Sequence, residues 1–398
     1  MKSASPKLNE LTQKQVHQMA FESIEKHLSL NSKGPQSSAQ MVWNILLAAA
    51  ANNTSIDYEC SQHEGAASAN TILGVLEDSF EVQTAEAEVN EALWHYLDPR
   101  CWKHAVSAAV DLVAVPYYGQ PASDPNEVRR GKAEQGTTHF HVFATVYVIR
   151  KNRRVTLALH YVRKDESLVS VLDTLKGYLD QRGIRVKLWL ADRAFCSVAA
   201  LQWFDQQPEA IVPMVARGKQ DPPSGSRVFF EELVSHWTDY TMHSDTEGQI
   251  CLRVAVARRY GYHSRRQGKR VPARTLVYAV VGKKVHLPSY RRSVHSVMVL
   301  YRHRFGIESS YRQMNQARLR TSSRSPTLRL LAAAIAFLLR NLWALCGWMT
   351  LAHSGPGRRG GTSKFRLETL LRWISKVVDQ KLGLRTSMQL PAASAQQF

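Results

Sequence analysis

The stretch from Val186 to Phe195, VKLWLADRAF, decides the fold. It reads as a short apolar strand that ends in a carboxylate, Asp192, with helical segments before and after it. Burying an ionised carboxylate without a partner costs several kcal/mol, so such an acid pairs with a cation, takes up a proton or binds a metal. Ligands of open α/β sheets gather at the carboxyl ends of strands, where Asp192 lies. The stretch therefore predicts a strand with a chemically active end.

Two further acids stand in related contexts. Asp111 lies in a second predicted buried strand, AAVDLVAVPYYG, and Glu308 lies in a predicted helix, YRHRFGIESSYRQMNQ. At 3.6 residues per turn, one face of this helix holds Tyr301, Arg304, Glu308 and Asn315. Taken alone, that face is more typical of a surface ion pair, which contributes only about 0.3–0.5 kcal/mol. Taken together, the three acids predict a three-carboxylate site for hard divalent cations.

The elements around these acids follow a recognisable order. We expect strands near 106–116, 139–149 and 154–162, a helix at 166–182, a strand at 184–191, a helix at 196–207 and a strand at 210–216. One acid lies inside the first strand and another at the end of the fourth, which is the ribonuclease H-like layout. The predicted fold class is α/β: a ribonuclease H-like mixed sheet flanked by helices, with a β-rich insertion before the third acid and an all-helical N-terminal region.

Changes in composition divide the chain into five predicted segments. These are a helical region at 1–103, the first part of the catalytic core at 104–216, a β-rich basic insertion at 217–288, the second, helical part of the core at 289–352, and a linker, C-terminal helix and tail at 353–398. Within them we expect strands around 250–258 and 274–281, and helices at 289–318, 326–350 and 363–380. Ser325 and Pro326 are typical of a helix start.

The N-terminal region leaves two interpretations open. The stretch TSIDYECSQHEGAASANTILGVL fits a helix-turn-helix whose second helix reads DNA, and it fits an ordinary helical bundle equally well. The residues that follow are acidic, including Glu77, Asp78 and Glu81, which argues against a phosphate contact on that face.

The net charge predicts a polyanionic partner. Lys and Arg number 52 against 33 acids, which gives +19 and a pI of about 9.9. The basic residues are spread along the chain, and the longest apolar run, Leu330 to Leu339, is too short to span a bilayer, so we expect no membrane contact. The five cysteines form no CxxC pair and the N-terminus has no apolar signal segment, which indicates a reducing compartment without structural zinc.

The insertion contains the most basic run of the chain, RRYGYHSRRQGKRVPAR, from Arg258 to Arg274. It holds seven cations and no acid, and tyrosines stand among them. A solvated loop is the alternative, but like charges repel without a counter-anion, which favours nucleic acid. The candidate DNA contacts are Arg258, Arg259, Arg265, Arg266, Lys269 and Arg270.

The three acids and their neighbours resemble those of DDE-type insertion-sequence transposases with a Tyr-x2-Arg-x3-Glu-x6-Lys signature around the third acid. Tyr301, Arg304 and Glu308 match that signature, and Asn315 stands where the family usually has lysine. Asp111 resembles the first acid and Asp192 the second, over about 104–350. The family lysine contacts transposon-end DNA, so Asn315 puts end binding in question, and Arg312 or Arg318 are candidates to compensate.

The resemblance implies an enzyme that cuts DNA at the ends of an insertion sequence and joins the 3′-hydroxyl ends to target DNA. The implied catalytic and metal-binding residues are Asp111, Asp192 and Glu308, which would hold two Mg²⁺ ions about 3.5–4 Å apart, with Mn²⁺ as a substitute. Tyr301, Arg304, Arg312 and Asn315 would contact DNA, with steadying of Glu308 as the alternative role for Tyr301 and Arg304. The implied partners are double-stranded DNA, as terminal inverted repeats and target, and a second copy of the chain, in the cytoplasm at a prokaryotic nucleoid.

Three other functions stay open. The chain could be a transposase-derived DNA-binding protein without cleavage, or a ribonuclease H-like nuclease without strand transfer. His139-Phe140-His141 also fits a single-strand nuclease with Tyr117 or Tyr118 as its nucleophile, although alternation on any strand places both histidines on one face. Cys196 is expected to be a packing residue because no base lies near it in the sequence.

Overall fold

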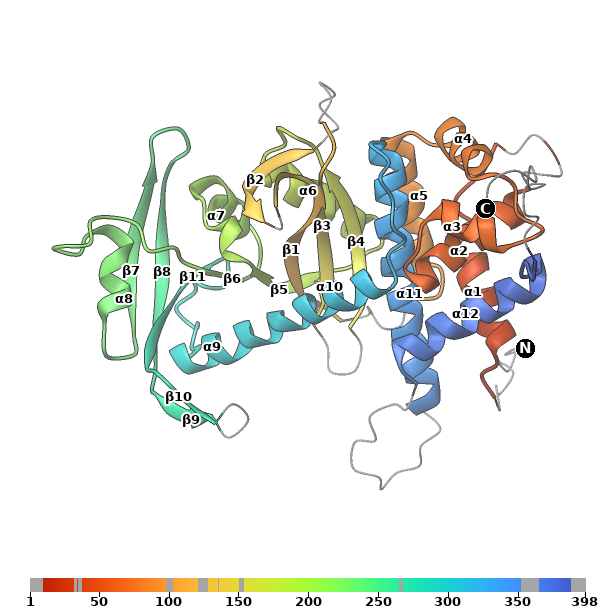
Figure 1. The fold of residues 1–398 in the computed structure, drawn as a ribbon. Helices are drawn as coiled ribbons and strands as arrows, with labels where there is room; N and C mark the ends of the chain where they lie inside the picture. The colour runs from red at the N-terminus through yellow and green to blue at the C-terminus, as the bar shows by residue number, and fades with distance from the viewer. Residues whose placement is uncertain are drawn as a thin grey trace. The chain divides into compact units, whose positions relative to one another are not determined.

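The computed structural model describes residues 10–31, 34, 38–97, 102, 104–120, 128–134, 136–149, 154–264, 268–351 and 365–387. The chain forms two compact units (Figure 1). The sheet unit comprises Asp98–Tyr118 and Ser123–Tyr311, and the helical unit comprises Met1–Leu97, Gly119–Ala122 and Arg312–Phe398.

One mixed sheet organises the sheet unit. Its strands are β1 (Val106–Tyr117), β2 (Arg129–Glu134), β3 (Thr137–Val148), β4 (Thr156–Val162), β5 (Val186–Ala191), β6 (Ala210–Pro213), β7 (His236–Ser244), β8 (Gly248–Arg259) and β11 (Arg274–Val281). Strand β3 pairs antiparallel with β1 along one edge and with β2 and β4 along the other. Strands β1, β5 and β6 are parallel. This is the predicted ribonuclease H-like sheet, and the strands expected near 106–116, 139–149, 154–162 and 184–191 are confirmed.

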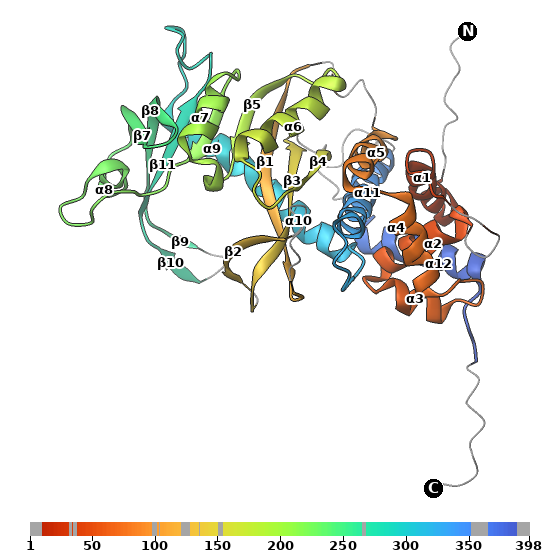
Figure 2. The same ribbon diagram turned by 90° about the horizontal axis from the view of Figure 1, so that it is seen from above.

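Helices cover both faces of this sheet (Figures 1 and 2). Helices α6 (Leu168–Gln181) and α7 (Val198–Asp205) lie on one face, where Trp189 of β5 packs against Trp203 and Phe204 at ring distances of 5.7 and 6.4 Å. The neighbours of Trp189, Leu188 and Leu190, point to the other face and share a buried cluster with α9 (Val294–Arg302). The two-residue period of the strand thus builds two apolar layers.

The β-rich insertion extends the central sheet. Strand β11 pairs antiparallel with β6, and β8 and β7 follow it outward. The strands expected around 250–258 and 274–281 are confirmed as β8 and β11. Two short helical segments, η4 (Gly225–Arg227) and α8 (Val228–Glu231), precede β7, and β9 (Tyr262–Ser264) pairs with β10 (Lys269–Val271) as a separate two-stranded ribbon.

Two edge strands escaped the sequence prediction for a physical reason. Strand β2, RRGKAE, is charged and mostly exposed, and β7 is only partly buried. An edge strand faces solvent along much of its length, so it needs no apolar alternation and is formed by pairing with its neighbour.

The helix expected at 289–318 is wrong in its continuity. Ser293 caps α9 by accepting from the Ser296 backbone N–H, and α9 ends at Arg302. A 3₁₀ turn, η5 (His303–Phe305), follows, and α10 (Gly306–Gln316) completes the segment. Gly306 lowers the helical propensity at this junction, and its Cα lies close enough to the Arg154 guanidinium that a Cβ would approach it at 3.1 Å.

Seven helices form the helical unit among its described residues. They are α1 (Gln13–Glu25), α2 (Ala39–Asn52), α3 (Ile56–Gln62), α4 (Ala69–Ser79), α5 (Val82–Trp94), α11 (Pro326–Leu351) and α12 (Leu367–Leu382). Helix α12 packs on α1 and α2, and α11 packs on α5. Ser325 caps α11 as expected, because its side chain accepts from the Leu328 N–H at 3.3 Å. Helix α11 is long and apolar enough to cross a membrane, but 78% of its most apolar window is buried inside the protein, which fits the predicted core helix.

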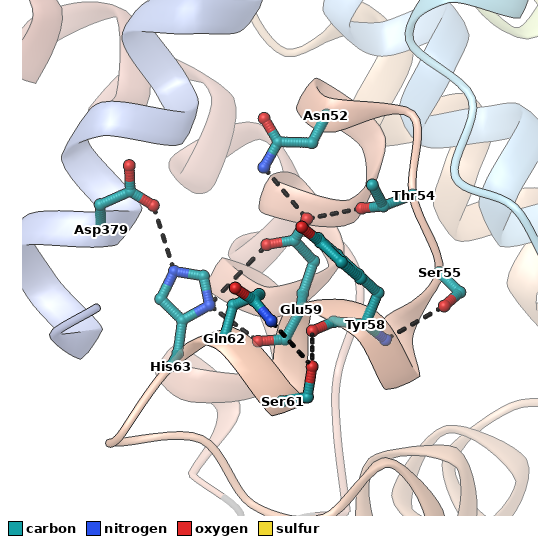
Figure 3. Close-up of polar contacts among 9 residues, drawn as sticks. All are labelled: Asn52, Thr54, Ser55, Tyr58, Glu59, Ser61, Gln62, His63 and Asp379. Carbon is teal, nitrogen blue, oxygen red and sulfur yellow. Dashed lines mark hydrogen bonds and ion pairs between the residues drawn. The ribbon is translucent and has the colours of Figure 1, made fainter. Parts of the chain in front are cut away.

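A buried polar cluster joins α3 to α12 (Figure 3). Glu59 accepts hydrogen bonds from Asn52 Nδ2 at 3.0 Å and from Thr54 Oγ1 at 2.5 Å. The two ring nitrogens of His63 face the Glu59 carbonyl oxygen at 2.8 Å and the Asp379 carboxylate at 3.2 Å. Backbone bonds continue the junction: the amides of Glu64 and Gly65 donate to the carbonyls of Gly383 and Leu382, and that of Arg385 donates to Gln62.

Candidate active site

Three carboxylates from three separate elements of the sheet unit lie close together. Asp111 is inside β1, Asp192 directly follows β5, and Glu308 is in the first turn of α10. Strands β1 and β5 are parallel neighbours in which Val110 pairs with Ala191, so the next residue of each strand is an acid. The sheet register therefore brings Asp111 and Asp192 side by side. The sequence argument assigned both strand acids to one site, and the register places them next to each other.

The guanidinium of Arg304 lies among the three carboxylates. Its Nη1 donates to Asp111 Oδ2 at 2.9 Å, and its Nη2 donates to Glu308 Oε1 at 3.0 Å and lies 3.5 Å from Asp192 Oδ1. The Arg304 side chain is 6% exposed, whereas those of Asp192 and Glu308 are 34% and 48% exposed. The acid group is thus closed on the Arg304 side and open to solvent on the side of Asp192 and Glu308.

Aromatic residues of the same segment fix Arg304. The guanidinium carbon lies 5.4 Å from the centre of the Tyr301 ring and 5.6 Å from that of Phe305, within the range of cation–π attraction. Tyr301 in turn packs against Tyr278 of β11 at 5.1 Å. The insertion therefore supports the third acid through its last strand.

A hydrogen bond ties α10 to the strand beside Asp111. The Tyr311 hydroxyl and Thr145 Oγ1 are 2.7 Å apart, and Thr145 is the register partner of Asp111 in β3. Burial raises the pKa of Tyr311 well above its ordinary value, so the phenol stays protonated. Glu308 is thereby held on a helix anchored to the strand next to β1.

The environment of Asp111 destabilises the ionised form of its carboxyl group. Burial raises the pKa of Asp111 to about 7, because the carboxylate loses its water. The Arg304 cation opposes this rise, and the charges of Asp192 and Glu308 add to it. The Leu112 N–H also donates to Asp111 Oδ1, at 2.9 Å. Perturbed acids of this kind are concentrated at functional sites.

The donor set suits a hard divalent cation. All three side chains offer carboxylate oxygens, which Mg²⁺ and Mn²⁺ prefer, and two of them are accessible to solvent. In the part of the chain that the structure describes, no three Asp, Glu, His or Cys side chains are close enough to hold one ion as they stand. The carboxylate oxygens contact the Arg304 nitrogens instead.

The other residues expected on this helix face lie in different environments. Tyr301 is 6% exposed and belongs to the buried core cluster, so its ring is packed inside the sheet unit. Arg312 and Asn315 are exposed on α10. The Asn315 carbonyl accepts from Asn53 Nδ2 at 2.9 Å, which leaves the Asn315 side chain outside that bond. Arg318 is partly buried and burial lowers its pKa, so Arg312 is the more accessible of the two compensating candidates.

The basic run of the insertion is divided by the fold. Lys269 and Arg270 are exposed on β10. Arg258 is partly buried and donates to Thr275 Oγ1 at 3.0 Å. Arg259, also partly buried, lines a cavity of about 270 Å³. Arg265 and Arg266 lie outside the described residues.

That cavity was missed by the sequence reasoning. Its walls combine four arginines with aromatic and methionine side chains: Arg193, Arg259, Arg274, Arg302, Met214, Phe230, Tyr278, Met298, Tyr301 and Phe305. Arg193 directly follows Asp192 in the chain, so the position of that acid was a signal that an additional cation stands beside the site. The other lining residues come from distant segments and became neighbours only through the pairing of β11 with β6.

The histidine pair and the cysteine have structural environments. His141 is fully buried on β3, and its Nδ1 lies 2.9 Å from the Tyr161 hydroxyl. Tyr117 packs edge-on against His141 at 5.2 Å. This arrangement fits a core contact, whereas a nuclease would present both histidines at an open site. Cys196 is buried, and burial raises the pKa of its thiol, as expected for a packing residue.

Comparisons with known proteins agree with this geometry. The family model described as "Transposase DDE domain" matches residues 109–342, a range that includes all three acids. A similar solved structure is the cryo-EM structure of a piggyBac transposase synaptic complex with hairpin DNA, with a TM-score of 0.50 and 11% sequence identity over 95% of this chain and 83% of that one. This likeness concerns the fold. No curated protein sequence matches the chain.

Proposed function

The chain belongs to the family of transposases with a DDE domain, and from that premise we propose that it cuts DNA at the ends of an insertion sequence and joins the 3′-hydroxyl ends to target DNA. The observation that carries this proposal is the convergence of Asp111, Asp192 and Glu308 around one guanidinium, from two parallel strands and a helix. Surface ion pairs along one helix would not bring in two strand acids. The chemistry of the proposed site is phosphodiester transfer.

In this proposal the three acids bind divalent cations, with Mg²⁺ as the natural choice and Mn²⁺ as a substitute. When bound, such ions activate the attacking oxygen and stabilise the charge that develops on the phosphate. Asp111, fixed in β1 by its strand register, would hold these ions together with Asp192 and Glu308. The greater exposure of Asp192 and Glu308 would leave room for a DNA strand on their side.

Exposed and cavity-lining cations provide the electrostatic part of DNA binding in this proposal. Arg312 is exposed on α10, beyond Glu308, and Lys269 and Arg270 are exposed on β10. Arg193 and Arg259 line the cavity whose wall also includes Tyr301 and Phe305, on either side of Arg304 in the chain. Each cation that neutralises a phosphate releases counterions, so binding is expected to weaken steeply with salt.

We further propose that two copies of the chain act together, each on one terminal repeat. The similar piggyBac structure is a synaptic complex, which supports this arrangement by analogy of fold. The acting form would be a homodimer on double-stranded DNA in the cytoplasm of a prokaryotic cell, at the nucleoid.

The test uses a labelled duplex that carries the element's own terminal repeat, incubated with Mg²⁺. Wild-type protein is expected to nick the repeat at its end, and Glu308→Gln, which removes one metal-binding oxygen charge, is expected to bind the duplex without cutting it. Asp180→Asn is the matched control, because Asp180 is an exposed acid of α6 that pairs with Lys176, and it should cut like the wild type. Binding without Mg²⁺-dependent cleavage by the wild type would contradict the enzymatic proposal and leave a DNA-binding protein.

A further inference from the structure

Arg304 makes contacts that are unusual for a residue expected to bind DNA. Its side chain is 6% exposed and its terminal nitrogens lie 2.9, 3.5 and 3.0 Å from oxygens of Asp111, Asp192 and Glu308. No fewer than three negative groups therefore share one positive charge. In this arrangement Arg304 faces the acids, and a DNA phosphate would have to compete with them for it.

The same contacts affect the metal site. Three carboxylates that approach one another repel, and a cation among them removes most of that repulsion. A guanidinium does this with directed hydrogen bonds to several oxygens. Those oxygens are the ones that a metal would need, and none of the described acid clusters is compact enough to hold an ion while the guanidinium lies between its members.

We propose that Arg304 is an internal substitute cation, which keeps Asp111, Asp192 and Glu308 together in the metal-free protein and must withdraw from them before divalent cations bind. This inference rests on the proposed metal chemistry of the same three acids. Arg304 is then a positioning residue that competes with the metal, and it lowers the metal affinity of the protein in the absence of DNA. A nuclease site that binds metal ions only weakly before DNA arrives is less able to cut DNA at random positions.

The surroundings of Arg304 allow such a withdrawal. The rings of Tyr301 and Phe305, 5.4 and 5.6 Å from the guanidinium carbon, can continue to stabilise the cation when carboxylates leave it. Phe305 is 48% exposed, so the segment borders solvent on one side. Among the residues that the structure describes, none accepts a hydrogen bond from the buried Nε of Arg304, so this atom does not fix the side chain in its present position.

The experiment measures Mn²⁺ binding to the full chain without DNA, by calorimetry and by the electron paramagnetic resonance signal of free Mn²⁺. Arg304→Gln removes the competing charge and is expected to bind Mn²⁺ about tenfold more tightly than the wild type. Arg304→Lys keeps the charge but places it on one nitrogen, without the planar fork that reaches Asp111 and Glu308 through separate nitrogens, so its affinity should lie between the two. Arg291→Gln is the matched control, since it removes the same charge from an exposed position that is not part of the cavity wall, and its affinity should equal that of the wild type.

A second readout covers the case in which Arg304→Gln folds poorly. Thermal unfolding with EDTA should show Arg304→Gln melting below the wild type, because three acids are left unbalanced, and saturating Mn²⁺ should recover more of its melting temperature than of the wild type's. Equal or weaker Mn²⁺ binding by both Arg304 variants would overturn the inference. Asp111→Asn separates the two levels: if it abolishes Mn²⁺ binding while the Arg304 variants behave like the wild type, the proposed function stands and the inference falls. No Mn²⁺ binding by any of the proteins would overturn both.

Discussion

Two buried carboxylates of this protein, Glu59 and Asp111, have different hydrogen-bonding and charge environments. Glu59 is 1% exposed, and neutral donors from Asn52 and Thr54 satisfy it. Asp111 is 8% exposed, but it shares its single strong cation with two other acids, and burial raises its pKa. The first arrangement stabilises the fold, whereas the second retains an electrostatic cost. Carboxyl groups with a raised pKa of this kind are typical of functional sites.

Glu59→Ala is predicted to destabilise the protein by about 1–2 kcal/mol, because the buried Glu59 side chain loses its hydrogen bonds from Asn52 and Thr54. Glu64→Ala removes an acid from an exposed position five residues later and should change the free energy of unfolding by less than about 0.5 kcal/mol. Urea unfolding followed by circular dichroism compares the two. Equal effects of both variants would show that the cluster in Figure 3 contributes nothing particular to stability.

Glu166 gives stability a dependence on acidic pH. Burial alone would raise the pKa of Glu166, but bonds from His160 at 2.9 Å, from the Arg163 N–H and from Ser170 outweigh it and lower the pKa to about 2. A lowered pKa in the folded state stabilises the protein above the ordinary pKa, and that stabilisation is lost as the pH falls from about 4.5 towards 2. Glu166→Gln should therefore cost on the order of 2 kcal/mol at pH 7.

The measurement for Glu166 is chemical unfolding of the wild type and of Glu166→Gln between pH 7 and pH 3. The difference in unfolding free energy should shrink as the pH falls below about 4.5. Asp165→Asn, at the exposed neighbouring position, supplies the control. A difference that stays constant with pH would mean that the charge of Glu166 is not what its neighbours stabilise.

The connection from β11 to the loop before α9 requires a glycine, Gly282. Gly282 follows β11 with φ of +124°, and a Cβ there would approach Glu209 Cα at 2.7 Å and Pro208 O at 2.9 Å. Gly282→Ala is predicted to cost about 2–3 kcal/mol, because both the conformation and the contact exclude a side chain. Gly177→Ala, inside α6 with nothing within 4 Å of the added carbon, should stabilise by about 0.5–1 kcal/mol. Thermal unfolding of both variants tests the contrast.

The extent of sequence-based prediction differs between elements. The apolar strands β1, β4 and β5 and the acids on them could be predicted, because buried strands must be apolar and a charge within them is conspicuous. The edge strands β2 and β7 could not be predicted, because a strand that faces solvent can form with many different sequences. The break between α9 and α10 lies beside Gly306, whose low helical propensity is a weak local signal and does not by itself end a helix. The contacts of Arg304 with Asp111 and Asp192 join residues far apart in the sequence, so no local pattern reveals them.

DNA binding belongs to the scale of the whole molecule, whose formal charge is +19. Asn315 is exposed on α10 at the position where the resembling family has lysine. Asn315→Lys is predicted to tighten binding to the terminal repeat and to steepen the dependence of log K on log salt by about one unit, because one more phosphate is neutralised. Gel-shift titrations at several salt concentrations measure this slope.

Gln181→Lys adds the same charge at an exposed position of α6 and controls for net charge in the Asn315 experiment. Its effect should be smaller and equal for specific and unrelated DNA. If both lysine variants change binding alike, the position of Asn315 on α10 carries no special role in end recognition.

The junction of α3 with the residues after α12 has a consequence for the order of events during synthesis. Helices α1 to α5 leave the ribosome first, yet α11 covers α5, and α12 covers α1 and α2. The backbone hydrogen bonds donated by Glu64 and Gly65 also cannot form before Leu382 and Gly383 have been synthesised. Domains usually fold as they emerge, with the N-terminal one first. In this chain the apolar faces of α1, α2 and α5 stay exposed until the sheet unit has been translated. The packing of these helices is therefore completed after the sheet unit has been synthesised.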